Sequence, residues 1–503
     1  MELAFQSKPF HFLHHVMQET RFQEETAEII VPDSYPDIAA IADCCAEVIL
    51  RGKDCRDGSV TVAGGLKGVI LYTPEDGTYP RNLETYIPFS VKFEDSHLTA
   101  HAQVLCSIRV RSADARMINS RKALLRVNIG CEVTAYEQTT DVQYMLEDRP
   151  AELQTKEAGY TAGIPLETGE KSFVISDNIA LPPGRPTAAQ IYEFQCIPVL
   201  TDEKLVGNKA VFKGNLHCKM LYLAENENLY LHEQNIPFSQ YCELGNDYDE
   251  ETVNTQLMVT GYDLEPPVNH EGHQILLSIN MLAQCVVYGK QTLSLIEDAY
   301  SIKGTLLPQW KEYALECDLD YQKLSSNARL HIPGELREIL DTRVYWDYPD
   351  LTQRYDRAQI TVPLVVRVLG YDENGTLQAL TGKTEVTQEL AVSDDASCKA
   401  AMTQIEDVYA SPAAGGIEAR CTAQLTMRCC SRQKLRTLCG GEIKKDDQTN
   451  QNQPTLIVRT VEKDTPLWDL AKAYGTTVDH IAAANHLNDT FLVEDSMLLL
   501  PLS

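Results

Sequence analysis

Two groups of side chains near the N-terminus have types and spacings that suit chemistry. His11, His14 and His15 offer imidazole nitrogens to a metal ion, but no acidic or cysteine ligand stands at a fixed spacing from them, so a plain surface position is the simpler interpretation. Asp33 and Asp37 offer paired carboxylates, yet a proline precedes each, and such aspartates usually fix a turn through side-chain hydrogen bonds. The chain has no phosphate-binding glycine loop, zinc-protease helix motif or serine nucleophile elbow. We therefore predict no catalytic residue, no metal site and no cofactor, and we do not expect an enzyme.

The strongest local pattern lies at the C-terminus, between residues 456 and 501. An alternating strand at 457–461 leads through a polar loop to a helical period at 467–475, which ends in a glycine. A Thr-Thr pair then offers an N-cap to a second helix, within 476–485, and a closing apolar strand occupies 497–500. This order predicts a small α+β unit of β-α-α-β type.

This unit resembles a LysM domain. The residues that carry the resemblance occupy apolar and capping positions of that family and are Leu467, Trp468, Ala471, Tyr474, Thr476, Thr477, Ile481, Asn485, Leu498 and Pro501. Trp468 and Tyr474 stand at helical spacing, which is more often core packing than ligand contact.

The sequence departs from the LysM pattern at both rims of the family's binding groove. LysM domains that bind N-acetylglucosamine polymers usually carry Gly-Asp-Thr and Pro-Gly-Gln loops, whereas the aligned positions here read Asp464-Thr465-Pro466 and Glu494-Asp495-Ser496. Both glycines that let a backbone approach a sugar are absent, so the resemblance implies a groove for a protein more than for a glycan. The partner-binding residues carried over from the pattern are Asp464, Thr465 and Pro466 on one rim and Asn485, Asn488, Leu492 and Val493 on the other. For each of these, a packing or capping role is an equal alternative.

Composition excludes several classes of function. The 503 residues include 72 acidic and 44 basic side chains, and the resulting charge of -28 would repel nucleic acid and anionic lipid headgroups. No apolar run is long enough to cross a bilayer, and the first twenty residues lack the apolar centre of a secretory signal. Fifteen cysteines, mostly within apolar runs and without a CxxC pair, predict buried free thiols in a reducing compartment. We expect a cytoplasmic protein.

The body of the chain repeats itself with a period near 150 residues. Residues 65–72 (GLKGVILY) are echoed by 215–222 (NLHCKMLY), and Ile-Pro-Phe-Ser at 87–90 recurs at 236–239. A fainter third repeat follows, in which Pro-Gly at 333–334 falls 150 positions after the same pair at 183–184.

Within each repeat the apolar residues alternate or form β-branched runs, and turn sequences such as Pro74-Glu75-Asp76-Gly77 separate them. We predict a mainly β fold, with three tandem β-rich domains, each a sandwich or partial barrel with a short helix near 36–42, followed by the α+β unit. The expected bounds are 1–150, 151–294, a divergent third domain at 295–440, a flexible linker at 441–454 and the LysM-like domain at 455–503. The segment 138–171 is expected to join the first two domains.

Two words in the first repeat resemble landmarks of a known family. Residues 31–38 (VPDSYPDI) resemble the signature that opens SPOCS domains, and 119–122 (NSRK) resemble that family's second landmark. Three SPOCS-like repeats and a LysM-like domain are the arrangement of SPOCS-domain spore coat morphogenetic proteins. The resemblance implies a non-enzymatic scaffold or adaptor in sporulation. It implies a place at the forespore surface in the mother-cell cytoplasm, with the LysM domain binding a SpoIVA-type spore coat ATPase and other coat proteins as further partners.

Two other functions stay open from the sequence. The main alternative is a cell-wall protein that binds a peptidoglycan- or chitin-type glycan, which the LysM resemblance motivates and which would need export. The other is a catalyst on an unfamiliar β fold, which a deep cavity with convergent polar groups would favour.

Overall fold

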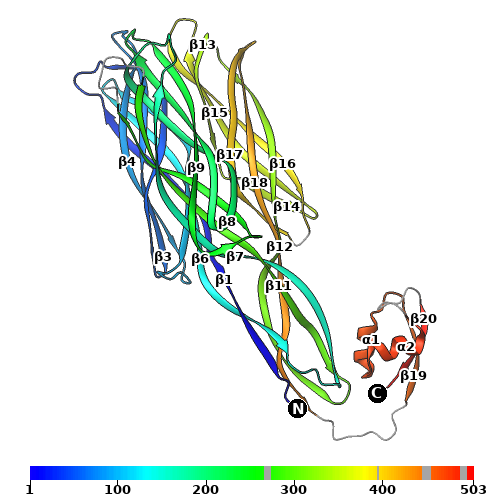
Figure 1. Ribbon diagram of the computed structural model, residues 1–503. Coiled ribbons are helices and arrows are strands. Elements are labelled where there is room, and N and C mark those ends of the chain that lie inside the picture. Colours follow the sequence, from blue (N-terminus) through cyan, green and yellow to red (C-terminus); the bar gives the residue numbers. More distant parts are fainter. Residues whose placement is uncertain (266–273, 394–395, 445–454, 488–494, 503) are drawn as a thin grey trace.

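The protein is built almost entirely of long β-strands, as the computed structural model in Figure 1 shows. The structure describes residues 1–265, 274–393, 396–444, 455–487 and 495–502. Its elements in chain order are β1 (Phe5–Ile30), β2 (Ile38–Arg56), β3 (Ser59–Pro74), β4 (Arg81–Glu94), β5 (Gln103–Asn119), β6 (Lys122–Leu146), β7 (Leu153–Ala180), β8 (Ala188–Ala224), β9 (Leu229–Tyr248), β10 (Thr252–Glu265), β11 (Gln274–Ser301), β12 (Thr305–Pro333), β13 (Glu338–Trp346), β14 (Asp350–Arg354), β15 (Arg357–Tyr371), β16 (Leu377–Ala391), β17 (Ala396–Ala413), β18 (Gly416–Lys444), β19 (Leu456–Val461), α1 (Leu467–Tyr474), α2 (Val478–Asn485) and β20 (Ser496–Pro501). The predicted mainly β fold class with a C-terminal β-α-α-β unit is confirmed.

One strand arrangement occurs three times along the chain. In the orders β1-β6-β5, β7-β11-β10 and β12-β18-β17, the last strand of each set lies between the first strand and the strand before it. The strands between them in sequence form a second sheet each time, namely β2-β3-β4, β8-β9, and β13-β15-β14 with β16 on β15. We call β1–β6, β7–β11 and β12–β18 the first, second and third repeat.

The alternation of apolar residues explains the sandwich of the first repeat. Along β6, every second residue from Ala123 to Ala135 is fully buried, because successive side chains of a strand point to opposite faces. These residues share one core with Val60, Leu66 and Ile70 of β3.

The sequence echoes between the first two repeats mark one packing arrangement. A Cβ atom on Gly64 would lie 2.5 Å from both the Ile49 carbonyl oxygen and the Phe89 ring. In the second repeat Gly214 meets the ring of Phe238 in the same way. Glycine is needed at both positions because a strand and an aromatic ring approach the backbone too closely for any side chain.

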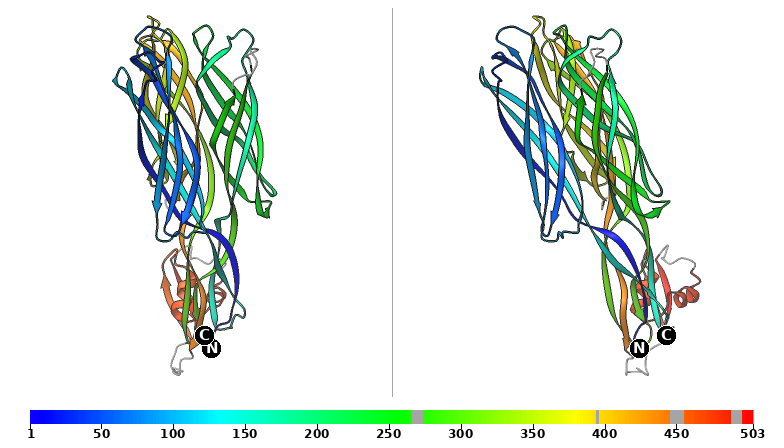
Figure 2. Two further views of the ribbon diagram at one scale, coloured as in Figure 1. Left: turned by 90° about the vertical axis from the view of Figure 1, so that its left-hand side faces the viewer. Right: turned by 60° about the vertical axis from the view of Figure 1, so that its left-hand side comes forward.

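The first and last strands of each repeat extend beyond the sandwiches into a narrower bundle, which we call the stalk (Figures 1 and 2). It contains one strand pair from each repeat, β1 with β6, β7 with β11 and β12 with β18. Its interior is apolar and includes Leu153, Leu293, Leu295, Leu315 and Leu438. The α1–α2 unit lies beside this stalk in both figures.

Some sequence-based expectations were wrong. No helix forms at 36–42, because β2 begins at Ile38 and pairs with β3. The segment 138–171, expected to join the first two domains, consists mainly of the end of β6, to Leu146, and the start of β7, from Leu153, and both strands build the stalk. The first residues of the expected linker belong to β18, and 445–454 lie outside the described residues. Among the described residues, no helix has the length and apolar character needed to cross a membrane.

Candidate protein-binding site

The two short motifs that resemble family landmarks, residues 31–38 and 119–122, come into contact through Arg121. Its guanidinium donates hydrogen bonds to the carbonyl oxygens of Val31 (2.9 Å), Pro32 (2.9 Å) and Tyr35 (2.8 Å). It also donates to Asp37 Oδ1 at 3.0 Å. The planar five-donor guanidinium suits this task, because it binds several acceptors in one plane. Arg121 therefore clamps the loop that enters β2 against the turn before β6.

The polar groups considered for chemistry have structural roles in this part of the chain. Asp37 accepts hydrogen bonds from Ser120 Oγ and Arg121, and these bonds lower the pKa of its carboxyl group. His11 Nδ1 lies 2.8 Å from Thr140 Oγ1 across the β1–β6 pair. Within the described residues, no group of three His, Cys, Asp or Glu side chains is arranged to hold a metal ion.

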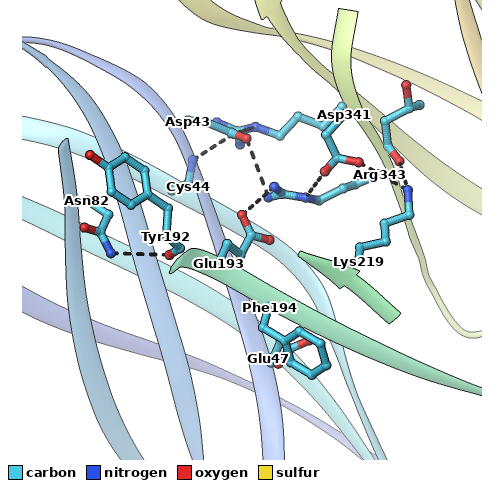
Figure 3. Close-up of polar contacts among 12 residues, drawn as sticks. Asp43, Cys44, Glu47, Asn82, Tyr192, Glu193, Phe194, Lys219, Asp341 and Arg343 are labelled. Atoms are coloured by element: carbon cyan, nitrogen blue, oxygen red, sulfur yellow. Dashed lines mark hydrogen bonds and ion pairs between the residues drawn. The ribbon is translucent and has the colours of Figure 1, made fainter. Parts of the chain in front are cut away.

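A buried ionic cluster joins the three repeats, as Figure 3 shows. Arg343 on β13 donates to Glu193 on β8 at 2.5 Å and to its neighbour Asp341 at 2.7 Å, and it lies 3.5 Å from Asp43 on β2. Arg343 is 6% exposed and Asp43 is 1% exposed. Arg367 on β15 also pairs with Asp43.

Every acid in this cluster has a basic partner. Lys219 lies 3.2 Å from Asp341 and 3.0 Å from Glu233, so three basic side chains face Asp43, Glu193, Asp341 and the more exposed Glu233. Burial tends to raise the pKa of the Glu193 carboxyl, and burial opposed by Arg343 and Lys219 leaves the pKa of Asp341 lowered. Buried charges are tolerated when they are paired in this way, so the cluster is a contact shared by all three repeats.

Several cavities lie where the described repeats meet. One has a volume of about 600 Å³ and is lined by residues from all three repeats, including Glu47, Ile108, Leu257 and Tyr345. Another, of about 490 Å³, lies between the first and second repeats. A third, of about 510 Å³, is lined by Arg428, which pairs with Glu316, and by Glu132, which accepts a hydrogen bond from Gln18. We see in these pairs contacts between strands and no arrangement of a nucleophile with a base.

Local sequence signals explain the fold of the C-terminal unit. Thr477 caps α2, with its hydroxyl accepting a hydrogen bond from His480 N at 3.1 Å. Gly475 ends α1 in the left-handed conformation with φ of 62°. The helices pack on one face of the β19–β20 pair, around Leu467, Ile481 and Leu500.

The first predicted rim is a tight exposed loop. Asp464 is exposed and adopts φ of 63°, a left-handed conformation that glycine favours and aspartate tolerates. Thr465 Oγ1 donates to the Glu462 carbonyl at 2.8 Å, and Pro466 stands at the N-cap of α1. Asp464 therefore holds a backbone conformation that glycine, the usual residue at the aligned LysM position, adopts more readily.

On the second predicted rim, Asn485 is committed to internal contacts. Its amide nitrogen donates to the carbonyls of Ile481 (2.8 Å) and Leu499 (2.7 Å), and its oxygen accepts from Leu499 N at 2.7 Å. Its side chain thus ties α2 to β20. The remaining predicted residues, Asn488, Leu492 and Val493, lie outside the described residues.

The outer face of the β19–β20 pair is an apolar surface that sequence reasoning missed. Its large side chains are Leu456 (49% exposed), Val458 (55%), Met497 (71%) and Leu499 (38%). Val458 and Leu499 are direct cross-strand partners, so these side chains share one face. The sequence contains the signal for this surface. Both strands have apolar residues at adjacent positions, which point to opposite faces of the sheet, and the two helices of the unit cover only one of these faces. Trp468 and Tyr474, in contrast, pack against the core as their helical spacing predicts, and Trp468 also contacts Asp298 and Tyr300 on β11.

Two family models match the chain. Residues 187–265 match the SipL SPOCS domain, and residues 460–501 match the LysM domain. No curated protein and no solved structure matches. The SPOCS match covers β8 to β10 of the second repeat, although the landmark words that suggested the family lie in the first. SPOCS and LysM domains are non-catalytic binding domains.

Proposed function

We propose that this SipL-like chain, which carries a SPOCS domain and a LysM domain, is a non-enzymatic scaffold or adaptor in spore coat assembly. In this proposal it acts at the forespore surface in the mother-cell cytoplasm. Its LysM domain binds a SpoIVA-type spore coat ATPase, and the SPOCS repeats provide further faces for other coat proteins. Several weak contacts on one molecule would then act together through their effective concentration.

The observation that carries the proposal is the outer face of the LysM sheet. Leu456, Val458, Met497 and Leu499 expose large apolar side chains side by side on a unit of fewer than fifty residues. Adjacent exposed apolar side chains on a small domain mark protein interaction sites, because burying them against a partner removes apolar surface from water. The rim residues Asp464, Thr465 and Pro466 stay part of the proposed contact surface.

The three interlocked repeats support this role physically. The buried cluster around Arg343 joins all three repeats through ion pairs, which favours a constant spacing of the surfaces that they present. A scaffold that organises other proteins benefits from such rigidity, because binding then costs less conformational entropy.

A glycan-binding protein is the second candidate, and one observation favours it. Asp464 keeps the left-handed backbone at the place where a sugar-binding LysM domain usually has glycine. The loop could therefore still direct backbone amides toward a sugar. Measuring binding to a SpoIVA-type ATPase and to peptidoglycan side by side distinguishes the two candidate functions.

The test measures binding of the full-length protein to a purified SpoIVA-type ATPase by calorimetry and to purified peptidoglycan by co-sedimentation. We expect Val458→Lys and Met497→Lys to weaken ATPase binding at least tenfold, which corresponds to about 1.4 kcal/mol. The matched control is Val174→Lys, because Val174 on β7 is also 55% exposed but lies outside the LysM domain. Circular dichroism checks that each variant is folded.

Protein binding that depends on Val458 and Met497, without peptidoglycan binding, supports the adaptor. Binding to peptidoglycan alone overturns it in favour of the glycan-binding candidate. If both variants bind the ATPase as tightly as the wild type, the outer sheet face is not the surface that contacts the ATPase.

A further inference from the structure

The LysM domain already contacts one segment of this chain, the end of β11 together with Ile302 directly after it. Asp298, Tyr300 and Ile302 stand at alternate positions and face the LysM domain, while Ala299 between them packs into the stalk. A β-bulge between Ile296 and Asp298 shifts the register with β7. Bulges re-aim the side chains that follow them, which explains why this short segment faces outward from the stalk.

Asp298 is held by two donors from α1. Trp468 Nε1 donates to Asp298 Oδ2 at 2.8 Å, and Lys472 Nζ donates to both carboxylate oxygens at 2.6 and 2.7 Å. Trp468 and Lys472 are four residues apart, so they lie one above the other on the helix. Partial burial works to raise the pKa of Asp298, but the hydrogen bonds from Lys472 and Trp468 outweigh it and lower the pKa.

Tyr300 makes the second set of contacts. Its ring lies edge-on to the ring of Trp468, with 5.0 Å between the centroids, and its hydroxyl donates to the Thr476 carbonyl at 2.7 Å. Tyr300 is 6% exposed, and burial raises its pKa to about 12, so the hydroxyl remains a donor. Ile302 adds an aliphatic contact to the same LysM core.

The spacing of donors and acceptors fits a strand lying along a helix. Side chains two apart on a strand are about 6.7 Å apart, which is close to the advance of about 5.4 Å of one helical turn. Asp298 meets both Trp468 and Lys472 on α1, whereas Tyr300 meets Trp468 and the Thr476 carbonyl just beyond the end of α1. The aspartate accepts hydrogen bonds from two donors, the tyrosine donates to a carbonyl oxygen and packs on an indole ring, and the isoleucine packs on the LysM core.

We infer that the face formed by Trp468, Lys472 and Thr476 is a binding site for extended polypeptide segments of the pattern Asp-x-Tyr-x-Ile, and that residues 298–302 occupy it as an internal ligand. A segment of another protein with an acid, an aromatic residue and an aliphatic residue at alternate positions binds by taking the place of residues 298–302 on this face. This face is distinct from the outer sheet face that the proposed function uses. Either can therefore fail without the other.

The first experiment tests the internal contact in the full-length protein. Asp298→Lys and Lys472→Glu each place like charges together, so we expect hydrogen exchange of residues 467–474 to speed up about tenfold or more in each single variant. The double variant restores an opposite-charge pair and most of the protection. Asp469→Asn is the control, because Asp469 is exposed on the same helix and outside the contact. Unchanged exchange in both single variants overturns the internal contact.

The second experiment tests recognition of a separate chain. A fluorescein-labelled peptide Asp-Ala-Tyr-Ser-Ile, the sequence of residues 298–302, is titrated into the full-length protein and followed by anisotropy. We expect the Asp298→Ala/Tyr300→Ala variant to bind it at least tenfold tighter than the wild type, because the internal ligand no longer competes. Adding Lys472→Glu abolishes that binding, and a peptide with lysine in place of aspartate restores it.

The peptide experiment leaves no neutral outcome. The inference is overturned if the wild type and the Asp298→Ala/Tyr300→Ala variant bind the peptide equally well, or if that variant does not bind it. It is also overturned if the affinity for the peptide does not depend on Lys472. No coat protein takes part, so the result is independent of whether the LysM domain binds a SpoIVA-type ATPase.

Discussion

Arg343 and Glu193 stand 150 positions apart in the chain and form a buried ion pair of 2.5 Å. Asp43 lies another 150 positions earlier and is 3.5 Å from the same arginine. Equivalent positions of the three repeats thus carry an acid, an acid and a base, and they meet. Three identical charges at such a point would repel one another in a medium of low dielectric constant, so divergence of the third repeat is what makes the junction stable.

The first prediction concerns this junction. Replacing Arg343 by methionine keeps most of the side-chain volume but leaves the buried Glu193 without its ion-pair partner, while Asp43 keeps Arg367. Breaking a buried ion pair from one side typically costs about 3–5 kcal/mol, so we expect a loss of that size in the free energy of unfolding. Urea unfolding followed by circular dichroism measures it.

The control for that variant is Arg357→Met, because Arg357 pairs with Glu389 on an exposed surface where such pairs contribute about 0–1 kcal/mol. If the two variants lose the same stability, the buried cluster does not hold the repeats together.

The second prediction concerns the pH dependence of stability through Glu47. Burial, and then the nearby charge of Glu193, raise the pKa of Glu47 to about 8 from an ordinary value of 4.5. Between these two values the folded state keeps a proton that the unfolded state has released, so stability falls as pH rises through this window, by up to about 1.4 kcal/mol per pH unit. Glu47→Gln is neutral at every pH, and its amide oxygen can still accept the hydrogen bond from Cys196 N.

We therefore expect the stability of Glu47→Gln to fall less steeply than that of the wild type between pH 5 and pH 8. Melting temperatures at four pH values measure this. Some slope remains, since burial also raises the pKa of Glu203 to about 7. Glu94→Gln is the control, because its pKa is lowered and it does not titrate in this window. Parallel pH profiles for the wild type and Glu47→Gln would contradict the assignment.

The third prediction concerns the Arg121 clamp. The Arg121→Lys variant keeps the positive charge but loses the planar guanidinium that reaches Val31, Pro32 and Tyr35 together. We therefore expect the free energy of unfolding to fall by about 1–2 kcal/mol. Hydrogen exchange should rise at residues 31–37. Arg126→Lys serves for comparison, because Arg126 makes one exposed pair with Glu24 at 3.5 Å. A loop equally protected in both variants would argue against the clamp.

Local signals made the C-terminal unit predictable. The Thr477 cap, the Gly475 stop and the helical period act within a few residues, and each appears in the structure. The mainly β fold class followed from alternation for the same reason. The helix expected at 36–42 was wrong, because pairing of β2 with β3 overrides a weak local preference. The domain boundaries proposed from the sequence stay a prediction.

The contacts between distant residues could be predicted only in part. Aligning the repeats at a shift of 150 places Asp43, Glu193 and Arg343 in one column, but the sequence does not say that the three strands meet. The contact of Asp298 with Lys472 joins positions 174 residues apart that share no repeat. It also follows a β-bulge between Ile296 and Asp298, where the alternation of side chains along β11 is interrupted.

The fourth prediction separates a structural from a partner-binding role for Asn485. Its side chain makes three hydrogen bonds to Ile481 and Leu499, and loss of both donors and the acceptor costs about 2–3 kcal/mol. We expect Asn485→Ala to speed hydrogen exchange along β20 and to lower the melting temperature of the LysM domain, and we expect Asn485→Asp to do the same, because a carboxylate cannot donate to the two carbonyl oxygens. A contact residue behaves differently: its replacement weakens ATPase binding while β20 stays protected. If Asn485→Ala leaves β20 exchange unchanged yet reduces binding tenfold, the side chain belongs to the interface and its internal bonds contribute little to stability.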